Sequence, residues 1–383
     1  MLWAMGRPVA ILLAASLACV ESQGAESHES DAAETGPALP SASADPRREP
    51  VAAAITLTFV GDVMEGRYRD WGHDPIAPPE FSTFGHVRDL LDADVVVANL
   101  ETPIVPVLPI RSPVETRSRF GAAAPFAKTL REAGVTVVSL ANNHWYDLAE
   151  EGQLRTPAIL VAEGILPVGA SLATGSPFRV ETLERSGLRI GFIAVTTRRN
   201  GPARPGPLIA PYRPIEQLVA TVAPLLRDAR ATHDLLVVLV HWGRQYHDEP
   251  EDAQVAAGHA LVDAGADLVV GHHPHVIQAI ERYGSGLVAY SLGNFLMEHT
   301  GEVPRLSGVL RLSYGGRPAC LVAGRFHPVL IRRTPYQHPV PASGHLASGV
   351  RRRLHALSAT LGTRWVGDDG TEDLILDDLP SCP

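Results

Sequence analysis

The sequence lacks several features that would assign it to common classes of protein. It has no excess of positive charge, because 33 Lys and Arg are outnumbered by 42 Asp and Glu, giving a formal net charge of -9. Such a chain repels polyanions unless a local cationic site reverses the field, so nucleic acid is not an expected partner. No apolar run is long enough to span a bilayer, and no internal repeat is visible. With 45% hydrophobic residues, the chain can nevertheless bury a large core.

Cysteine is also scarce, with three in 383 residues. Cys19 ends the N-terminal apolar segment, which leaves Cys320 and Cys382. In an oxidising compartment these two are predicted to form a disulfide, and the alternative is two unrelated buried thiols.

Residues 1–19 have the pattern of an export signal, with Arg7 before an apolar run at 9–18 that ends in small residues. Residues 16–19 resemble a lipobox, although such signals prefer Leu where Ser16 stands. A lipoprotein signal and an ordinary secretory signal therefore stay open, with an uncleaved anchor as a third alternative. We expect an exported protein that is lipid-anchored in the cell envelope, periplasmic or secreted. Its only expected membrane attachment is an N-terminal lipid.

The rest of the chain divides by composition. Residues 20–52 are rich in Ala, Ser, Glu, Asp, Gly and Pro, and are predicted to be a disordered linker because they lack apolar surface. Residues 53–335 are predicted to form one folded domain, and residues 336–383 a C-terminal helical extension.

Short runs rich in Val, Ile and Leu alternate with segments of helical period after residue 55, which predicts an α/β fold with a mostly parallel core sheet. The predicted strands are at 55–60, 94–98, 135–140, 189–195, 235–240, 267–270 and 287–290. The predicted helices are at 125–133, 149–163, 214–229, 252–263 and 345–361. The alternating segments 308–312 and 319–331 predict antiparallel strands appended to this core.

Polar clusters follow almost every predicted strand. Because the carboxyl ends of parallel strands share one edge of a sheet, we expect side chains from distant clusters to meet there. Each side chain also has a structural alternative, such as a turn or helix cap, a solvated carboxylate or a hydrogen-bonded core histidine. The candidates are Asp62, Glu101, Asn143, His144, His241, His273 and His275.

Three histidines lie within residues 272–275, and a purely structural role explains them less well than it explains the other clusters. His273 and His275 can point to the same side if the backbone is extended there. Together with the carboxylates they make an oxygen and imidazole ligand set, which suits Mn²⁺, Zn²⁺ or Fe²⁺ better than a thiolate-binding metal. Two such ions bridged by a carboxylate would generate hydroxide near neutral pH.

The segments GDVM, NLETP, ANNHWYD, HWGRQY, GADLVVGHHPHVIQ and YSLGNF follow one another between residues 56 and 295. This series resembles the poly-γ-glutamate capsule synthesis (CapA-type) family. The resemblance implies a calcineurin-like, metallophosphoesterase-type layered fold for the main domain. It makes Asp62 the opening metal ligand and Glu101 the bridging carboxylate, and it places His144 beside the ligands as an acid. In the leading hypothesis for the reaction, His144 or His241 moves a proton. The remaining implied ligands are Asn143, His241, His273 and His275.

The sequence departs in two places from the metallophosphoesterase pattern and in two from the CapA-type pattern itself, the latter at Gln245 and Ala149. Met64 stands where metallophosphoesterases have a histidine, which predicts a weak or absent first ion. The closing Gly-His-x-His pattern has an extra residue, which leaves the role of His272 open. Gln245 replaces an expected Glu, and Ala149 an expected Gly, so substrate contacts are expected to differ.

Four residues are candidates for binding substrate. Arg117 and Arg119, in the long loop after Glu101, can pair with acidic groups, and the alternative is a solvated basic face. Trp242 is a further candidate, with core packing as its alternative, and Asn294 can instead support the site from behind.

The implied function is that of a metal-dependent, hydrolase-like enzyme acting on an anionic cell-envelope polymer, such as poly-γ-glutamate or a capsule precursor. Membrane-bound capsule synthesis proteins are its expected partners. The alternative is a non-catalytic polymer-binding or export component, which Met64 favours. A phosphoesterase of nucleotides or phospholipids rests on analogy of fold alone.

Overall fold

A computed structural model describes residues 55–115, 118–170, 176–201, 212–316, 319–368, 370–377 and 379. All of them belong to one of two compact units, Leu39–Pro383. The predicted signal and the whole of the predicted linker lie outside the described residues, as do Arg117 and Cys382. Within the described part of the chain, no helix is long and apolar enough to cross a membrane.

The first sheet has ten strands. Its strands are parallel on one side of β1 (Ile55–Val63), the strand that comes first in the chain, and antiparallel on the other. The parallel strands are β1, β4 (Val95–Leu100), β7 (Val137–Ser139), β8 (Leu166–Val168) and β15 (Asn294–Leu296), the last pairing with β1. The antiparallel strands are β16 (Leu306–Gly315), β17 (Cys320–Arg332), β18 (His338–Pro341), β19 (Trp365–Gly367) and β20 (Leu374–Leu376).

The second sheet has six strands, with four parallel strands at its centre and an antiparallel strand on each edge. The central strands are β10 (Leu188–Thr196), β11 (Leu235–His241), β12 (Leu268–His272) and β14 (Gly286–Ala289). The edge strands are β9 (Glu181–Arg185) and β13 (Ile280–Tyr283). Two small ribbons pair β2 (Gly66–Arg69) with β3 (Gly72–Pro75), and β5 (Ile104–Val105) with β6 (Ala122–Ala123).

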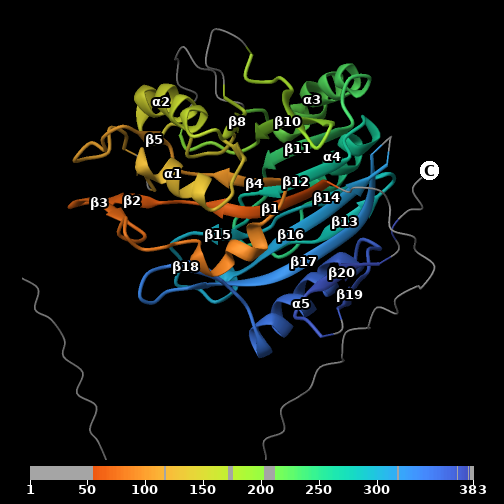
Figure 1. The fold of residues 1–383 in the computed structure, drawn as a ribbon. Helices are drawn as coiled ribbons and strands as arrows, with labels where there is room; N and C mark the ends of the chain where they lie inside the picture. Colours follow the sequence, from red (N-terminus) through yellow and green to blue (C-terminus); the bar gives the residue numbers. More distant parts are fainter. Residues whose placement is uncertain are drawn as a thin grey trace, which may run out of the picture. The chain divides into compact units, whose positions relative to one another are not determined.

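The two sheets pack face to face, and helices cover their outer faces (Figure 1). One buried apolar cluster joins Phe59 of the first sheet to Phe192 of the second. On the first sheet lie η1 (Gly85–Leu91), α1 (Pro125–Glu132) and α2 (Ala149–Ala162). On the second lie α3 (Ile215–Arg230) and α4 (Asp252–Asp263). The remaining elements are η2 (Val303–Arg305) and α5 (Gly344–Ala359), which adds Val350 and Leu354 to the inter-sheet core.

The predicted layered α/β fold, with a mostly parallel core and an appended antiparallel region, is confirmed. Every predicted strand and helix is present, with ends displaced by a few residues. The sequence pattern did not reveal that the parallel strands are divided between two sheets, because a buried strand has the same apolar run in either sheet. Residues 336–383 contain β18, β19 and β20 beside α5. The boundaries at 19, 52 and 335 stay predictions.

Cys320, at the start of β17, is disulfide-bonded. The two other cysteines of the chain, Cys19 and Cys382, lie outside the described residues. Pairing of Cys320 with Cys382 therefore stays a prediction.

Candidate metal centre

The predicted ligands come from strand ends of both sheets. Asp62 lies near the end of β1, and Glu101 directly follows β4. His241 ends β11, and His273 directly follows β12. All four side chains are buried, with no more than 7% of any residue exposed. The carboxyl ends of these strands therefore converge on one site, as expected, and this site lies between the two sheets.

Local backbone features hold these strand ends in place. A Cβ on Gly61 would lie 2.0 Å from the carbonyl oxygen of Gly293, so only glycine allows β1 to approach this segment so closely. The same carbonyl accepts a hydrogen bond of 3.0 Å from the Asp62 amide. His273 and His275 have positive φ values of 95° and 59°, which non-glycine residues rarely adopt. Strained backbone of this kind is concentrated at functional sites.

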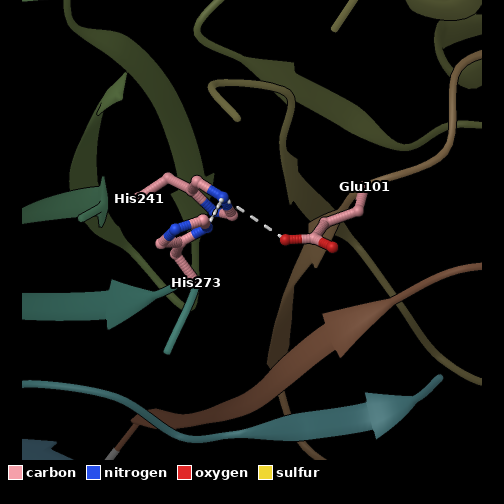
Figure 2. A group of neighbouring side chains, drawn as sticks. All are labelled: Glu101, His241 and His273. Atoms are coloured by element: carbon pink, nitrogen blue, oxygen red, sulfur yellow. Dashed lines mark hydrogen bonds and ion pairs between the residues drawn. The ribbon is translucent and has the colours of Figure 1, made fainter. Parts of the chain in front are cut away.

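A first donor group joins Glu101, His241 and His273, whose ligand atoms all lie within 4.8 Å of one another. Figure 2 shows the two imidazoles side by side, with the Glu101 carboxylate directed toward them. His241 Nε2 is 3.0 Å from His273 Nδ1 and 3.4 Å from Glu101 Oε1. Asn143 Oδ1 lies 2.7 Å from the same nitrogen, so this predicted ligand also reaches the group.

A second donor group joins Asp62, Glu101 and His275, again within 4.8 Å. His275 Nδ1 lies 3.1 Å from Asp62 Oδ2. Glu101 therefore belongs to both groups, which is the position that the family resemblance implies for a bridging carboxylate. Met64 is fully buried in an apolar cluster with Phe120 and Met297, and adds no donor to this second group.

Burial and neighbouring charges set the protonation of the donors. Burial lowers the pKa of His241 well below its usual value, and the adjacent His273 lowers it further. The pKa of His273 is lowered well below its usual value for the same reason, first by burial and then by His275. Both imidazoles are therefore neutral at neutral pH, the form in which histidine binds metal.

The acidic members differ from each other in protonation. Burial, followed by the charge of Asp62, raises the pKa of Glu101 to about 7. Burial by itself would raise the pKa of Asp62, but its hydrogen bond with His275 and the charge of that imidazole keep it below the usual value. Burial by itself would lower the pKa of His275. The negative charges of Glu101 and Asp62 outweigh this effect and raise the pKa of His275 to about 9.

The donor set fits a divalent cation. Among the described residues, Glu101 Oε2 is buried and has no hydrogen-bond partner. A buried acceptor without a partner is costly, and a bound cation would satisfy it. Carboxylate, amide and imidazole donors together suit Mn²⁺, Zn²⁺ or Fe²⁺.

Asn99, the second-last residue of β4, is a site residue that the sequence did not single out. Its amide nitrogen donates to Asp62 Oδ1 at 2.8 Å and lies 3.2 Å from His241 Nδ1. It therefore links one donor of each group. His272, whose role was left open, is buried with Nε2 3.3 Å from the carbonyl oxygen of Val60, which is a structural contact.

His144 stands beside the two donor groups rather than in them. Its Nδ1 is 2.6 Å from Asp147 Oδ2, and that carboxylate also accepts from the Phe120 amide at 2.7 Å. The Phe120 ring stacks on the imidazole with a centroid distance of 3.8 Å. Asp147 was not singled out from the sequence, although it belongs to the ANNHWYD segment.

Among the described residues, two cavities adjoin the donor groups. The first, the His144 cavity, has a volume of about 330 Å³ and is lined in part by Arg67, Phe120, His144, His275 and Glu298. The second, the arginine cavity, has a volume of about 480 Å³ and is lined in part by Asn143, Arg198, Arg199, Arg244 and His273. Gln245 and Tyr246 line both cavities.

Two of the predicted substrate-binding residues are corrected. Trp242 is fully buried, and its indole nitrogen donates to the Tyr290 carbonyl at 2.9 Å, so it packs the core instead of contacting substrate. Asn294 is also fully buried, and its Oδ1 lies 2.9 Å from His275 Nδ1, so it supports that imidazole. Arg119 is partly buried and lines neither cavity, and its role stays a prediction, as does that of Arg117.

The departures at residues 149 and 245 have local explanations. Ala149, the first residue of α2, has a φ of 53°, where glycine is favoured. Gln245 Nε2 lies 3.4 Å from His275 Nε2, so this departure changes a contact of the second donor group.

Comparison with known proteins assigns the family. The model of the family described as "Bacterial capsule synthesis protein PGA_cap" matches residues 56–299. The chain belongs to this family. The matched residues contain both donor groups, the His144–Asp147 pair and, apart from Thr300, the residues that line the two cavities.

Curated relatives have names that agree with the family. The chain is 32% identical over 259 residues to "Capsule biosynthesis protein CapA" of Bacillus anthracis, a match that covers 64% of this chain and 60% of that protein. It is 29% identical over 249 residues to "PGA biosynthesis protein CapA" of Bacillus subtilis (strain 168), covering 64% and 63%. The chain thus spans less than two thirds of the length of these relatives.

Among solved structures, a hypothetical protein from Thermus thermophilus matches with a TM-score of 0.40 and 23% identity, covering 75% of this chain and 98% of that one. A likeness of this size carries no argument about function.

Proposed function

We propose that the protein is a metal-dependent, hydrolase-like enzyme that acts on an anionic cell-envelope polymer, either poly-γ-glutamate or a capsule precursor. The observation that carries the proposal is the pair of donor groups that share Glu101. One carboxylate held between two sets of imidazole and oxygen donors is the arrangement used by two-metal hydrolytic sites. The description of the family and the names of the two relatives support the choice of polymer.

We extend the proposal to location and partners. The names of the relatives support a place in the cell envelope, and the export pattern of residues 1–19 agrees with it. Membrane-bound capsule synthesis proteins are the proposed partners. Attachment by an N-terminal lipid and secretion without an anchor stay alternative proposals for the location of the exported chain.

Asn143, His241, His273 and Glu101 would hold one ion, and Asp62, His275 and Glu101 the other. When bound, such ions polarise a substrate oxygen and lower the pKa of a coordinated water. Asn99 and Asn294 fix the orientation of His241 and His275 from behind, because each donates or accepts a hydrogen bond at an imidazole nitrogen.

His144 is the proposed proton donor to the leaving group. Asp147 holds its Nδ1, which leaves Nε2 without a hydrogen bond among the described residues while the ring lines the cavity. A positioned imidazole of this kind typically accelerates a reaction by about 10²–10⁴-fold. His241 lines neither cavity and is enclosed by Asn143, Glu101 and His273, so we propose it as a ligand rather than a proton donor.

Met64 favours a second candidate function, a non-catalytic polymer-binding or export component. In place of an imidazole, a fully buried thioether lies in an apolar cluster with Phe120 and Met297. This weakens a two-metal site without removing the cavities beside it.

The test is a metal analysis of the purified protein combined with incubation of poly-γ-glutamate. The enzyme proposal expects bound Mn, Zn or Fe and shortening of the polymer that stops on chelation and resumes when metal is restored. Polymer binding without shortening by the metal-replete protein would favour the second candidate. Absence of metal together with absence of binding would contradict both. Glu184→Gln, an exposed carboxylate on the edge strand β9, is the matched control for Glu101→Gln.

A further inference from the structure

The arginine cavity beside the metal centre has the composition of an anion-binding site. Arg198 and Arg199 follow the carboxyl end of β10, and Arg244 follows that of β11. These two strands are parallel neighbours, which brings the three guanidinium groups to the same edge as His273. No acidic side chain lines this cavity in the described part of the chain.

Few acidic groups of the described residues neutralise these arginines. Arg198 has one distant ion pair, 3.6 Å from Nη2 to Glu251 Oε2, and its Nε is buried without an acceptor among the described residues. Arg199 lies over the ring of Tyr212 at 4.7 Å, a contact that orients the guanidinium, and its nitrogens have no hydrogen-bond partner among the described residues. Neither Arg199 nor Arg244 has an ion pair within the described residues.

The other cavity differs in charge. Its arginine, Arg67, is paired with Glu298 at 2.6 Å. The arginine cavity is therefore the part of the site where unpaired positive charge is concentrated, on a chain whose net charge is -9. A polyanion is repelled by such a chain except where a local cluster reverses the field.

We propose that Arg198, Arg199 and Arg244 form an anion subsite, which binds a negatively charged group of the polymer next to the metal centre. This proposal rests on the proposed function, and it adds on which side of the metal centre the acidic polymer is bound. Guanidinium groups bind carboxylate or phosphate through paired hydrogen bonds, so the recognised chemistry is an oxyanion.

Gln245 and Tyr246 mark the path between the two cavities. Tyr246 has a positive φ of 62°, and its amide donates to the Pro274 carbonyl at 2.8 Å, which fixes this residue beside His275. A polymer bound to the arginines therefore passes Tyr246 to reach His144. The acidic group lies on the side of His273, and the leaving end lies on the side of the proposed proton donor.

The test compares two double variants that remove the same charge. Arg199→Ala with Arg244→Ala deletes the two arginines that have no ion pair among the described residues. Arg185→Ala with Arg227→Ala is the control. Arg185 lies beside the amino end of β10, whereas the arginine cavity lies at the carboxyl ends of the strands, and Arg227 lies in α3. Binding of a labelled γ-linked glutamate oligomer is measured on metal-replete protein, with a glycerol phosphate oligomer as the second arm. Metal content and melting temperature are measured on the same samples.

We expect the first variant to bind the glutamate oligomer about tenfold or more weakly, as the loss of two charge-assisted contacts predicts. Its metal content and melting temperature should match the wild type, and the control should bind as the wild type does. Equal binding by both variants would overturn the subsite and leave the proposed function standing. Wild-type protein that binds neither oligomer would overturn the proposed function and the subsite with it. Arginine-dependent binding of the phosphate oligomer alone would support the subsite and contradict a carboxylate polymer.

Discussion

Glu101 Oε1 lies 3.4 Å from His241 Nε2, and both side chains are fully buried where the ends of two different sheets meet. The contact joins the strand end of β4 to that of β11, which are remote in sequence. The same carboxylate reaches Asp62 and His275 on its other side. Glu101 is thus the one member common to the two donor groups of the described residues, and its loss should affect both.

The first prediction concerns metal content. Glu101→Ala should remove ions from both donor groups, whereas His273→Ala and His275→Ala should each affect one, because each imidazole belongs to a single group. The melting temperature of the metal-free proteins should change little, since residues after strand ends contribute little to the core. Elemental analysis and thermal melting of the same preparations measure both effects. Unchanged metal with a lower melting temperature would identify these residues as structural.

The second prediction concerns support of an imidazole from behind. Asn294→Ala removes the oxygen that lies 2.9 Å from His275 Nδ1. Loss of such a partner typically weakens metal binding by about 10–100-fold. Competition with a chelator of known affinity measures the change. Asn294→Asp, which keeps an oxygen in this place, should recover part of the affinity, and equal losses in the two variants would argue for a packing defect.

The sequence predicted much of this centre because polar residues directly after apolar strands are visible without a structure. Asp62, Glu101 and His241 each lie within three residues of the end of a predicted strand. Asn99 directly follows the predicted strand 94–98, but an asparagine there is equally well explained by a turn. Only its contacts with Asp62 and His241 show that it belongs to the site. Trp242 carries no mark that separates a core indole from a substrate contact, and only its burial decides.

The arginines could not be found in the same way. The sequence pointed to Arg117 and Arg119 because they follow Glu101 in one loop. The arginine cavity instead joins Arg199 to Arg244, which become neighbours only through the pairing of β10 with β11. The division of the strands between two sheets is equally hidden, because pairing partners are not encoded in the apolar run of a strand.

The third prediction concerns stability and pH. Burial raises the pKa of Glu65 to about 7, and its neighbour His73 has a pKa lowered by burial, so the carboxylate gains no charged partner there. The folded protein therefore binds more protons than the unfolded chain between the usual pKa of 4.5 and about 7. Stability should fall as pH rises through this window, by about 1.4 kcal/mol for each pH unit between the two pKa values.

Glu65→Gln removes this titration. Urea unfolding of metal-free wild type and variant at pH 5 and pH 8 measures the difference in free energy of unfolding. The variant should lose less stability than the wild type over this range. Parallel losses in the two proteins would show that Glu65 ionises as an ordinary exposed carboxylate.

The fourth prediction concerns the strained start of α2. Ala149→Gly relieves a positive φ of 53°, but it also increases the freedom of the unfolded chain. The net effect should be a gain of about 0.5–1 kcal/mol in the free energy of unfolding. Ala158→Gly, at an exposed position inside the same helix, should instead cost about 1 kcal/mol. Destabilisation by both substitutions would contradict the strain argument.

The last prediction separates proton transfer from metal binding. His144→Asn should retain both ions, because His144 belongs to neither donor group, and should slow polymer cleavage by about 10²–10⁴-fold. Asp147→Asn should keep the ring close to its place while weakening its orientation, since the carboxylate contacts both His144 Nδ1 and the Phe120 amide. It should therefore slow cleavage less and change the pH profile of the rate. Metal content, melting temperature and rate against pH are measured for both variants. If His144→Asn lost metal in proportion to its rate, His144 would be a ligand, and the proton would have to come from another group.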